Sequence, residues 1–75
     1  MSNITEKSIW RNTVGPNHSF VVEKIFENGW VNGKQVKTDE NGKLIKTAAG
    51  EVDTIIGTAF MAHCDTMLRL MEKVQ

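Results

Sequence analysis

The pattern of apolar and polar positions changes character near residue 47. Before that point, apolar residues come in short runs separated by turn signals, which predicts strands. The strongest run is SFVVEKIFE at 19–27, which is rich in β-branched and aromatic residues and has apolar side chains on both faces. We therefore expect this strand inside a sheet rather than at its edge. A first strand is expected within 7–14, preceded by a frayed terminus at 1–6.

Two asparagine–glycine pairs follow the strongest strand. Asn28-Gly29 is typical of a tight hairpin turn, and the return strand is expected to begin at Trp30. Asn32-Gly33 comes directly afterwards, which predicts a bulge or a second tight turn.

A further hairpin is expected at 34–47, and two registers are open. A three-residue loop at 40–42 would place Val36 opposite Lys46. A four-residue loop at 39–42 would place Val36 opposite Ile45. Cross-strand pairing of apolar side chains favours the second register.

Residues 48–75 have apolar positions at helical spacing, which predicts one long amphipathic helix. At about 100° per residue, its apolar surface covers roughly 200°, whereas a surface helix usually needs a little over 100°. One arc is expected against a sheet face; it contains Val52, Ile56, Ala59, Phe60, His63, Met67, Leu70 and Val74.

The remaining apolar positions of this helix form a second stripe. Its members are Gly57, Met61, Cys64, Leu68 and Met71. A glycine inside a helix costs about 1 kcal/mol relative to alanine, and close approach of another backbone would explain it. We expect the stripe to contact another chain, with a homodimer favoured; loops of the N-terminal half folded over it are the alternative.

The predicted fold is α+β, in a single domain spanning 1–75. It consists of a small antiparallel sheet of three to five short strands within 7–47, followed by one long C-terminal amphipathic helix over 48–75, packed on a sheet face. The run WRN…FVVEKI…NGWV resembles small bent-sheet or SH3-like modules over about forty residues. That resemblance implies short strands joined by tight turns and does not include the helix.

Composition narrows the functional classes. The chain has nine basic and nine acidic residues, whereas nucleic-acid binding usually calls for a positive excess. Cys64 is the only cysteine, so an internal disulfide is excluded, and one cysteine with two histidines is too few for the usual structural zinc site. A chain of 75 residues has a thin stability margin, which favours support from a partner. No secretion signal or membrane-length apolar run is evident, which predicts a cytoplasmic protein.

The candidate chemistry is sparse. On a helix, His63 and Cys64 would point about 100° apart and could not easily share a substrate or an ion. We therefore expect no catalytic residues, no metal site and no cofactor. His63 is expected in a core or an interface, and the alternative is a pH-sensitive or ligand contact.

Two further groups of residues are candidates for binding. Lys37 and Lys46 share a face of the hairpin in the favoured register and could contact phosphate, although lysines commonly guard an exposed edge strand. Trp10 and Trp30 could stack on bases or on a ligand ring.

The function predicted from these features is binding. We expect a small non-enzymatic interaction module that self-associates through its C-terminal helix and regulates or inhibits a protein target, of a kind common in phages and mobile elements. One alternative is a nucleic-acid-binding regulator that uses the Lys34–Lys46 hairpin. Another is a small-ligand binder with a pocket at a subunit seam.

Overall fold

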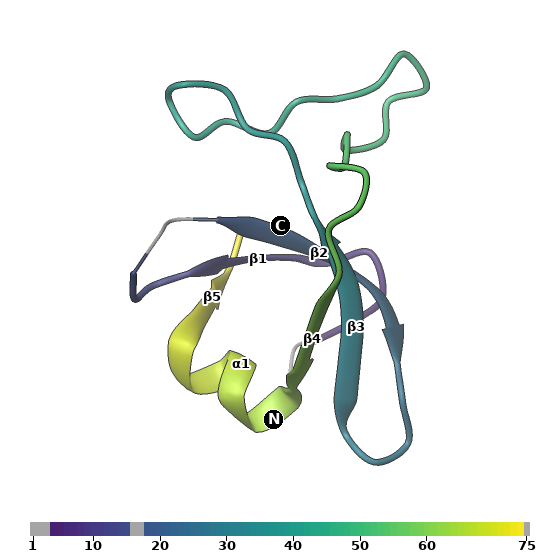
Figure 1. The fold of residues 1–75 in the computed structure, drawn as a ribbon, viewed down its shortest axis with the longest axis vertical. Helices are drawn as coiled ribbons and strands as arrows, with labels where there is room; N and C mark the ends of the chain where they lie inside the picture. Colours follow the sequence, from purple (N-terminus) through teal and green to yellow (C-terminus); the bar gives the residue numbers. More distant parts are fainter. Residues whose placement is uncertain (1–3, 16–17, 75) are drawn as a thin grey trace.

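A computed structural model describes residues 4–15 and 18–74 and shows a five-stranded antiparallel sheet bent into a half-barrel, with one short helix (Figure 1). The elements are β1 (Ile9–Asn12), β2 (Ser19–Ile25), β3 (Trp30–Gln35), β4 (Phe60–His63), α1 (Cys64–Leu70) and β5 (Met71–Lys73). The strand order is β4-β3-β2-β1-β5, so β4 and β5 are the two edges of the sheet among the described residues.

The first three strands follow the sequence pattern. The strongest apolar run forms β2, which lies inside the sheet between β1 and β3 as predicted. The turn before β3 includes Gly29, whose φ of 90° suits glycine, and the return strand begins at Trp30 as predicted. At the second asparagine–glycine pair, β3 continues straight through Gly33 to Gln35. The irregularity lies on the partner strand, where the register shifts between Val22 and Lys24.

One face of the sheet packs with α1 around the main hydrophobic cluster, which we call the inner cluster. Its buried members are Trp10, Val22, Val31, Met67 and Met71. Met67 and Val31 have no exposed surface. Phe20 and Phe60 stack beside the cluster, with ring centroids 4.4 Å apart. Helix α1 is thus held by its buried methionine and connects the two edge strands.

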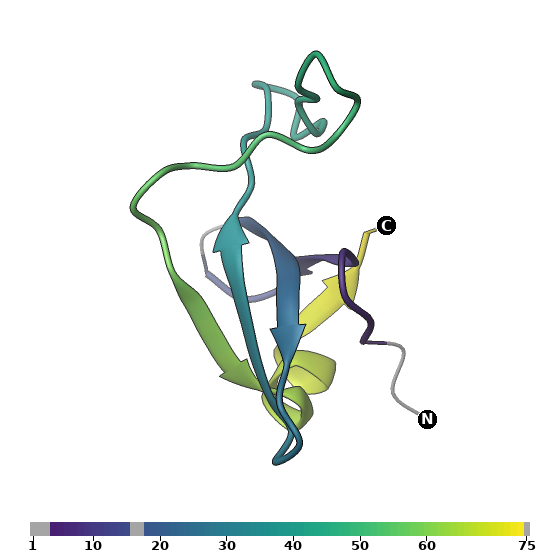
Figure 2. The same cartoon turned by 90° about the vertical axis from the view of Figure 1, so that its right-hand side faces the viewer.

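The opposite face carries a second, smaller cluster, which we call the outer cluster. Its buried members are Ile9, Val21 and Val36, and Leu44 and Val52 pack against them. Side chains alternate across a strand, so neighbouring residues of β1 and β2 supply the two clusters. Leu44 and Val52 belong to residues 36–56, which we call the arm. The arm extends from the end of the sheet opposite α1 (Figures 1 and 2).

The arm is held by isolated bridges that pair Val36 with Thr54, Thr38 with Leu44, and Lys46 with Val52. The Asp39 amide donates to the Lys43 carbonyl at 2.9 Å, which leaves a three-residue loop at 40–42. The register favoured by apolar pairing is therefore wrong, because Leu44 gains its contact from the outer cluster and not from a cross-strand partner.

The long C-terminal helix over 48–75 is also wrong, and with it the α+β description. Only seven residues, Cys64–Leu70, are helical, and the protein is mostly antiparallel sheet. The segment 51–55 pairs within the arm and Phe60–His63 adds β4 to the sheet. Gly57 lies in a turn with a φ of 87°, which ends any helical path there.

The physical reason lies in residue types that the helical spacing concealed. Val52, Thr54, Ile55, Ile56 and Thr58 are β-branched, and such residues favour strands because their χ1 angles are restricted in a helix. Within residues 4–15 and 18–74, no helix is long and apolar enough to cross a membrane.

Candidate functional site

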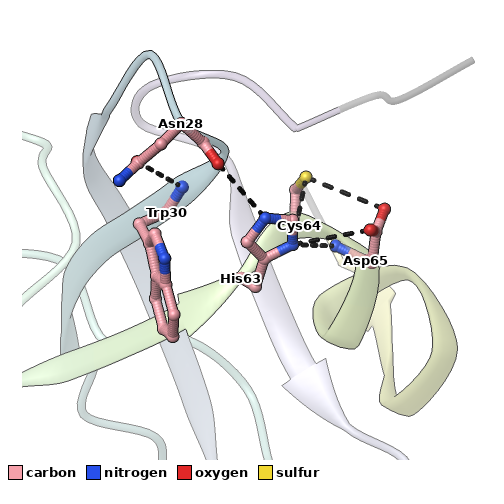
Figure 3. A network of polar contacts seen from close by, with 5 residues as sticks. All are labelled: Asn28, Trp30, His63, Cys64 and Asp65. Atoms are coloured by element: carbon pink, nitrogen blue, oxygen red, sulfur yellow. Dashed lines mark hydrogen bonds and ion pairs between the residues drawn. The ribbon is translucent and has the colours of Figure 1, made fainter.

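The point where β4 passes into α1 gathers three polar side chains that follow one another in the chain. His63 ends β4, and Cys64 and Asp65 begin α1. His63 has an extended backbone and serves as the N-cap, since its Nδ1 accepts a hydrogen bond from the Asp65 amide at 3.3 Å. The three side chains converge on one side of this junction (Figure 3).

The distances between the donor atoms are short. Cys64 Sγ lies 3.8 Å from His63 Nδ1, and an Asp65 carboxylate oxygen lies 3.6 Å from the same nitrogen. Cys64 Sγ lies 3.9 Å from the other Asp65 oxygen. The sequence argument that His63 and Cys64 diverge is wrong, because the chain changes from strand to helix between them.

The turn between β2 and β3 contacts this junction. The Asn28 carbonyl oxygen lies 3.2 Å from His63 Nε2, and the Cys64 amide donates to the Gly29 carbonyl at 2.9 Å. A Cβ at Gly29 would lie 2.8 Å from His63 Nε2, so a side chain there would displace the ring. The Trp30 ring meets the His63 ring edge-on, with centroids 5.6 Å apart (Figure 3).

This geometry does not form a nucleophilic relay. In a relay of cysteine, histidine and carboxylate, the thiol and the carboxylate face different nitrogens of the imidazole. Here Cys64 and Asp65 both face Nδ1, while Nε2 faces the carbonyl of Asn28. The arrangement suits a shared ion better than proton transfer between the three groups.

A patch with two large apolar and two polar side chains lies next to the junction on the outer face of β3 and β4. Trp30 pairs with His63 and Asn32 with Met61, so these four side chains project from the same face. Trp30 is 42 % exposed and Met61 is 61 % exposed. The arm covers the other end of this face, around Val36, and leaves the Trp30 end open. We call Trp30, Asn32, Met61 and His63 the outer patch.

No family model, curated protein or solved structure matches the chain.

The residues of the predicted helical stripe are scattered by the true fold. Gly57 lies in the exposed turn before β4, Met61 projects from β4, and Leu68 is 45 % exposed on α1. Cys64 is half-buried and packs against the inner cluster, whereas Met71 is buried within it. The stripe does not exist as one surface; only Met61 joins the outer patch.

The other predicted candidates also lie apart. Trp10 is 3 % exposed and donates its indole N–H to Ser8 Oγ at 3.0 Å, whereas Trp30 has an exposed face. Lys37 pairs with Asp53 at 3.3 Å across the arm. Lys46 lies in the arm on another bridge, opposite Val52.

A separate hollow of about 620 Å³ lies between the arm and the sheet. Its wall includes Lys7, Lys46, Glu6, Glu23 and Glu51, together with apolar residues of the outer cluster. Both charge signs line it in similar number, so it shows no preference for an anionic or a cationic ligand.

Only weak signals in the sequence point to this site. The contiguous His63-Cys64-Asp65 triplet combines three ligand types, and Asn28-Gly29 marks the turn that supports it. A change from strand to helix at residue 63 brings the triplet together, and the assumption of a continuous helix concealed that change.

Proposed function

We propose that the protein is a small, cytoplasmic, non-enzymatic interaction module. In this proposal, its binding surface is the outer patch and the neighbouring free edge of β4, in place of a long helix. The occupant is an extended segment of a target protein, which adds to the edge of the sheet as a further strand. Occupying such a segment would regulate or inhibit the target.

The observation that carries the proposal is the combination of an edge strand with exposed apolar side chains. Strand β4 has a sheet neighbour on one side only within the described chain. Main-chain groups of such an edge pair readily with an added strand, while flanking side chains select the sequence. Trp30 and Met61 supply large apolar contacts beside that edge, and aromatic residues and methionine are enriched at interfaces.

The charges elsewhere favour this function over binding to nucleic acid. Lys37 pairs with Asp53 across the arm, and Lys34 lies 3.7 Å from Glu23. Each pair reduces the positive potential that phosphates would need. The predicted lysine hairpin is thus nearly balanced in charge.

The experiment uses a library of random peptides displayed on phage, selected on the purified full chain. We expect wild-type protein to enrich extended, partly apolar peptides, and their binding to shift the NMR signals of β3 and β4. Replacing the central apolar anchor, Met61→Lys, should weaken binding about tenfold or more. The matched control is Val14→Lys, because Val14 and Met61 are both 61 % exposed and Val14 lies outside β4.

Two results would overturn the proposal. One is a selected peptide that binds Met61→Lys as tightly as wild type; the other is a failure of the wild-type chain to enrich any peptide. Light scattering over a hundredfold concentration range measures the mass of the protein and shows whether the chain self-associates. If the wild-type protein is a dimer and Met61→Lys is a monomer, the occupant of the outer patch is a second copy of this chain and not a segment of a target protein.

A further inference from the structure

The junction triplet of His63, Cys64 and Asp65 has the spacing of a metal site. Zinc bonds of about 2.0–2.3 Å at tetrahedral angles place nitrogen, sulfur and oxygen ligands about 3.3–3.6 Å from one another. In the protein, one ligand atom from each of the three residues lies within 4.8 Å of the others. Nδ1 lies 3.8 Å from Sγ and 3.6 Å from one Asp65 oxygen, and Sγ lies 3.9 Å from the other Asp65 oxygen. The two separations from Nδ1 exceed the tetrahedral edge by only about 0.3 Å. Small side-chain rotations would close that difference.

The imidazole is held in the tautomer that a metal requires. A backbone carbonyl only accepts hydrogen bonds, so the contact between the Asn28 oxygen and His63 Nε2 places the ring proton on Nε2. Nδ1 then keeps its lone pair, and the Asp65 amide already donates to it. Histidines that bind metals commonly donate their other ring N–H to a carbonyl in this way.

The supporting turn holds the ring from behind. Gly29 leaves room for the ring because it has no Cβ, and its carbonyl accepts the amide of Cys64. The Trp30 ring stands nearly perpendicular to the imidazole, at 89°, and limits its rotation on that side. The turn at Asn28 to Trp30 thus orients the imidazole before any ion arrives, which lowers the ordering required for binding.

The donor set selects the class of ion. One nitrogen, one sulfur and one oxygen ligand suit a borderline ion such as Zn²⁺, whereas Mg²⁺ and Ca²⁺ prefer oxygen ligands throughout. Among the residues described, this triplet is the one cluster with ligand atoms close enough to share an ion. The Asp65 side chain is 83 % exposed, so an ion can enter directly from solvent.

We propose that His63 Nδ1, Cys64 Sγ and the Asp65 carboxylate bind a Zn²⁺-class ion, with water at the fourth position. Cys64 binds as the thiolate, and its proton passes to the buffer; no group is oxidised or reduced. The ion takes the Nδ1 lone pair from the Asp65 amide, whose hydrogen bond is long at 3.3 Å. The site shares His63 with the outer patch, but Cys64 and Asp65 lie outside that patch, so the Zn²⁺ titration of their variants tests this proposal separately from peptide binding.

The test titrates the metal-free full chain with Zn²⁺ in a calorimeter and with Co²⁺ in a spectrophotometer. We expect one equivalent of Zn²⁺ to bind and Co²⁺ to produce a thiolate charge-transfer band in the near ultraviolet. Because loss of a supporting residue around a metal typically costs about 10–100-fold in affinity, loss of a direct ligand should cost at least that much. Cys64→Ser should therefore abolish the Co²⁺ band and weaken Zn²⁺ binding at least tenfold.

Two further variants make the result specific. Asp65→Asn should also weaken Zn²⁺ binding. Because that side chain is 83 % exposed, the substitution should leave the fold intact, which circular dichroism checks directly. His18→Gln removes the other histidine, which lies beside Gln35, and should leave the titration unchanged. The proposal fails if wild type binds no stoichiometric Zn²⁺, if Cys64→Ser binds as tightly as wild type, or if His18→Gln abolishes binding.

Discussion

The inner and outer clusters lie on opposite faces of the same strands, yet different kinds of structure cover them. Residues from β1, β2, β3, α1 and β5 supply the buried members of the inner cluster. The outer cluster has three buried residues, one of which is Val36 of the arm, and the segments of the arm pair through isolated bridges. Segments with few buried apolar contacts open locally at lower free energy than a core does. We therefore expect the inner cluster to set global stability and the arm to open by itself.

The largest effect is expected at Met67, which is fully buried in the inner cluster. Met67→Ala should lower the free energy of unfolding by about 2–5 kcal/mol, because it removes buried apolar contacts and leaves a cavity. Urea denaturation followed by tryptophan fluorescence measures the change. In a small domain this loss is a large part of the total stability.

Two further variants test whether the loss comes from the buried contacts of Met67. Leu68→Ala alters the next residue of α1, which is 45 % exposed, and should cost far less. Met67→Leu keeps most of the volume and should cost less than about 1.5 kcal/mol. If Leu68→Ala destabilised the protein as much as Met67→Ala, the helix rather than the buried contact would explain the loss.

A smaller effect is expected at Leu44, where the arm meets the outer cluster. Leu44→Ala should cost about 1 kcal/mol, because the side chain is half-buried and each buried methylene contributes about 0.8 kcal/mol. Hydrogen exchange should quicken at the amides of Lys37, Ile45 and Asp53, which bond within the arm. The control is Ile45→Ala, since Ile45 is 38 % exposed. Equal acceleration throughout β2 and β3 would show that the arm does not open separately.

The inner strands were predictable because local signals and tertiary contacts agree there. The run at 19–27 has strand-forming residues on both faces, and β2 is covered on both faces by the two clusters. Asn28-Gly29 marks its turn through the positive φ that glycine adopts easily. No distant partner has to be known for either inference.

The C-terminal half was mispredicted because helical and strand spacings overlap in it. Phe60 and Ala62 alternate along β4 toward the inner cluster, while Met67 reaches the same cluster from α1. On a helical wheel these positions merge into one broad apolar surface, and its excess width then predicts an interface that the fold does not contain as one surface. The positive φ of Gly57 and the β-branched run before it are the local signs of the true chain path.

The candidate metal site could not be predicted from its three residues alone. Cys64 and His63 converge only because the backbone changes conformation between them, and His63 is oriented by Asn28. That carbonyl lies 35 positions earlier in the chain, so its role depends on the pairing of β3 with β4. A spacing pattern within 48–75 carries no information about that contact.

The smallest effect is expected at an ion pair within the arm. Lys37 and Asp53 lie 3.3 Å apart with side chains that are 48 % and 35 % exposed, so solvent screens their attraction. Lys37→Ala should cost about 0.2–1 kcal/mol at low salt, and raising the ionic strength should reduce the difference from wild type. Lys43→Ala is the control, because no ion pair joins Lys43 to the described part of the chain. If Lys37→Ala lowered the stability as much as Leu44→Ala and independently of salt, polar contacts would hold the arm more strongly than packing on the outer cluster does.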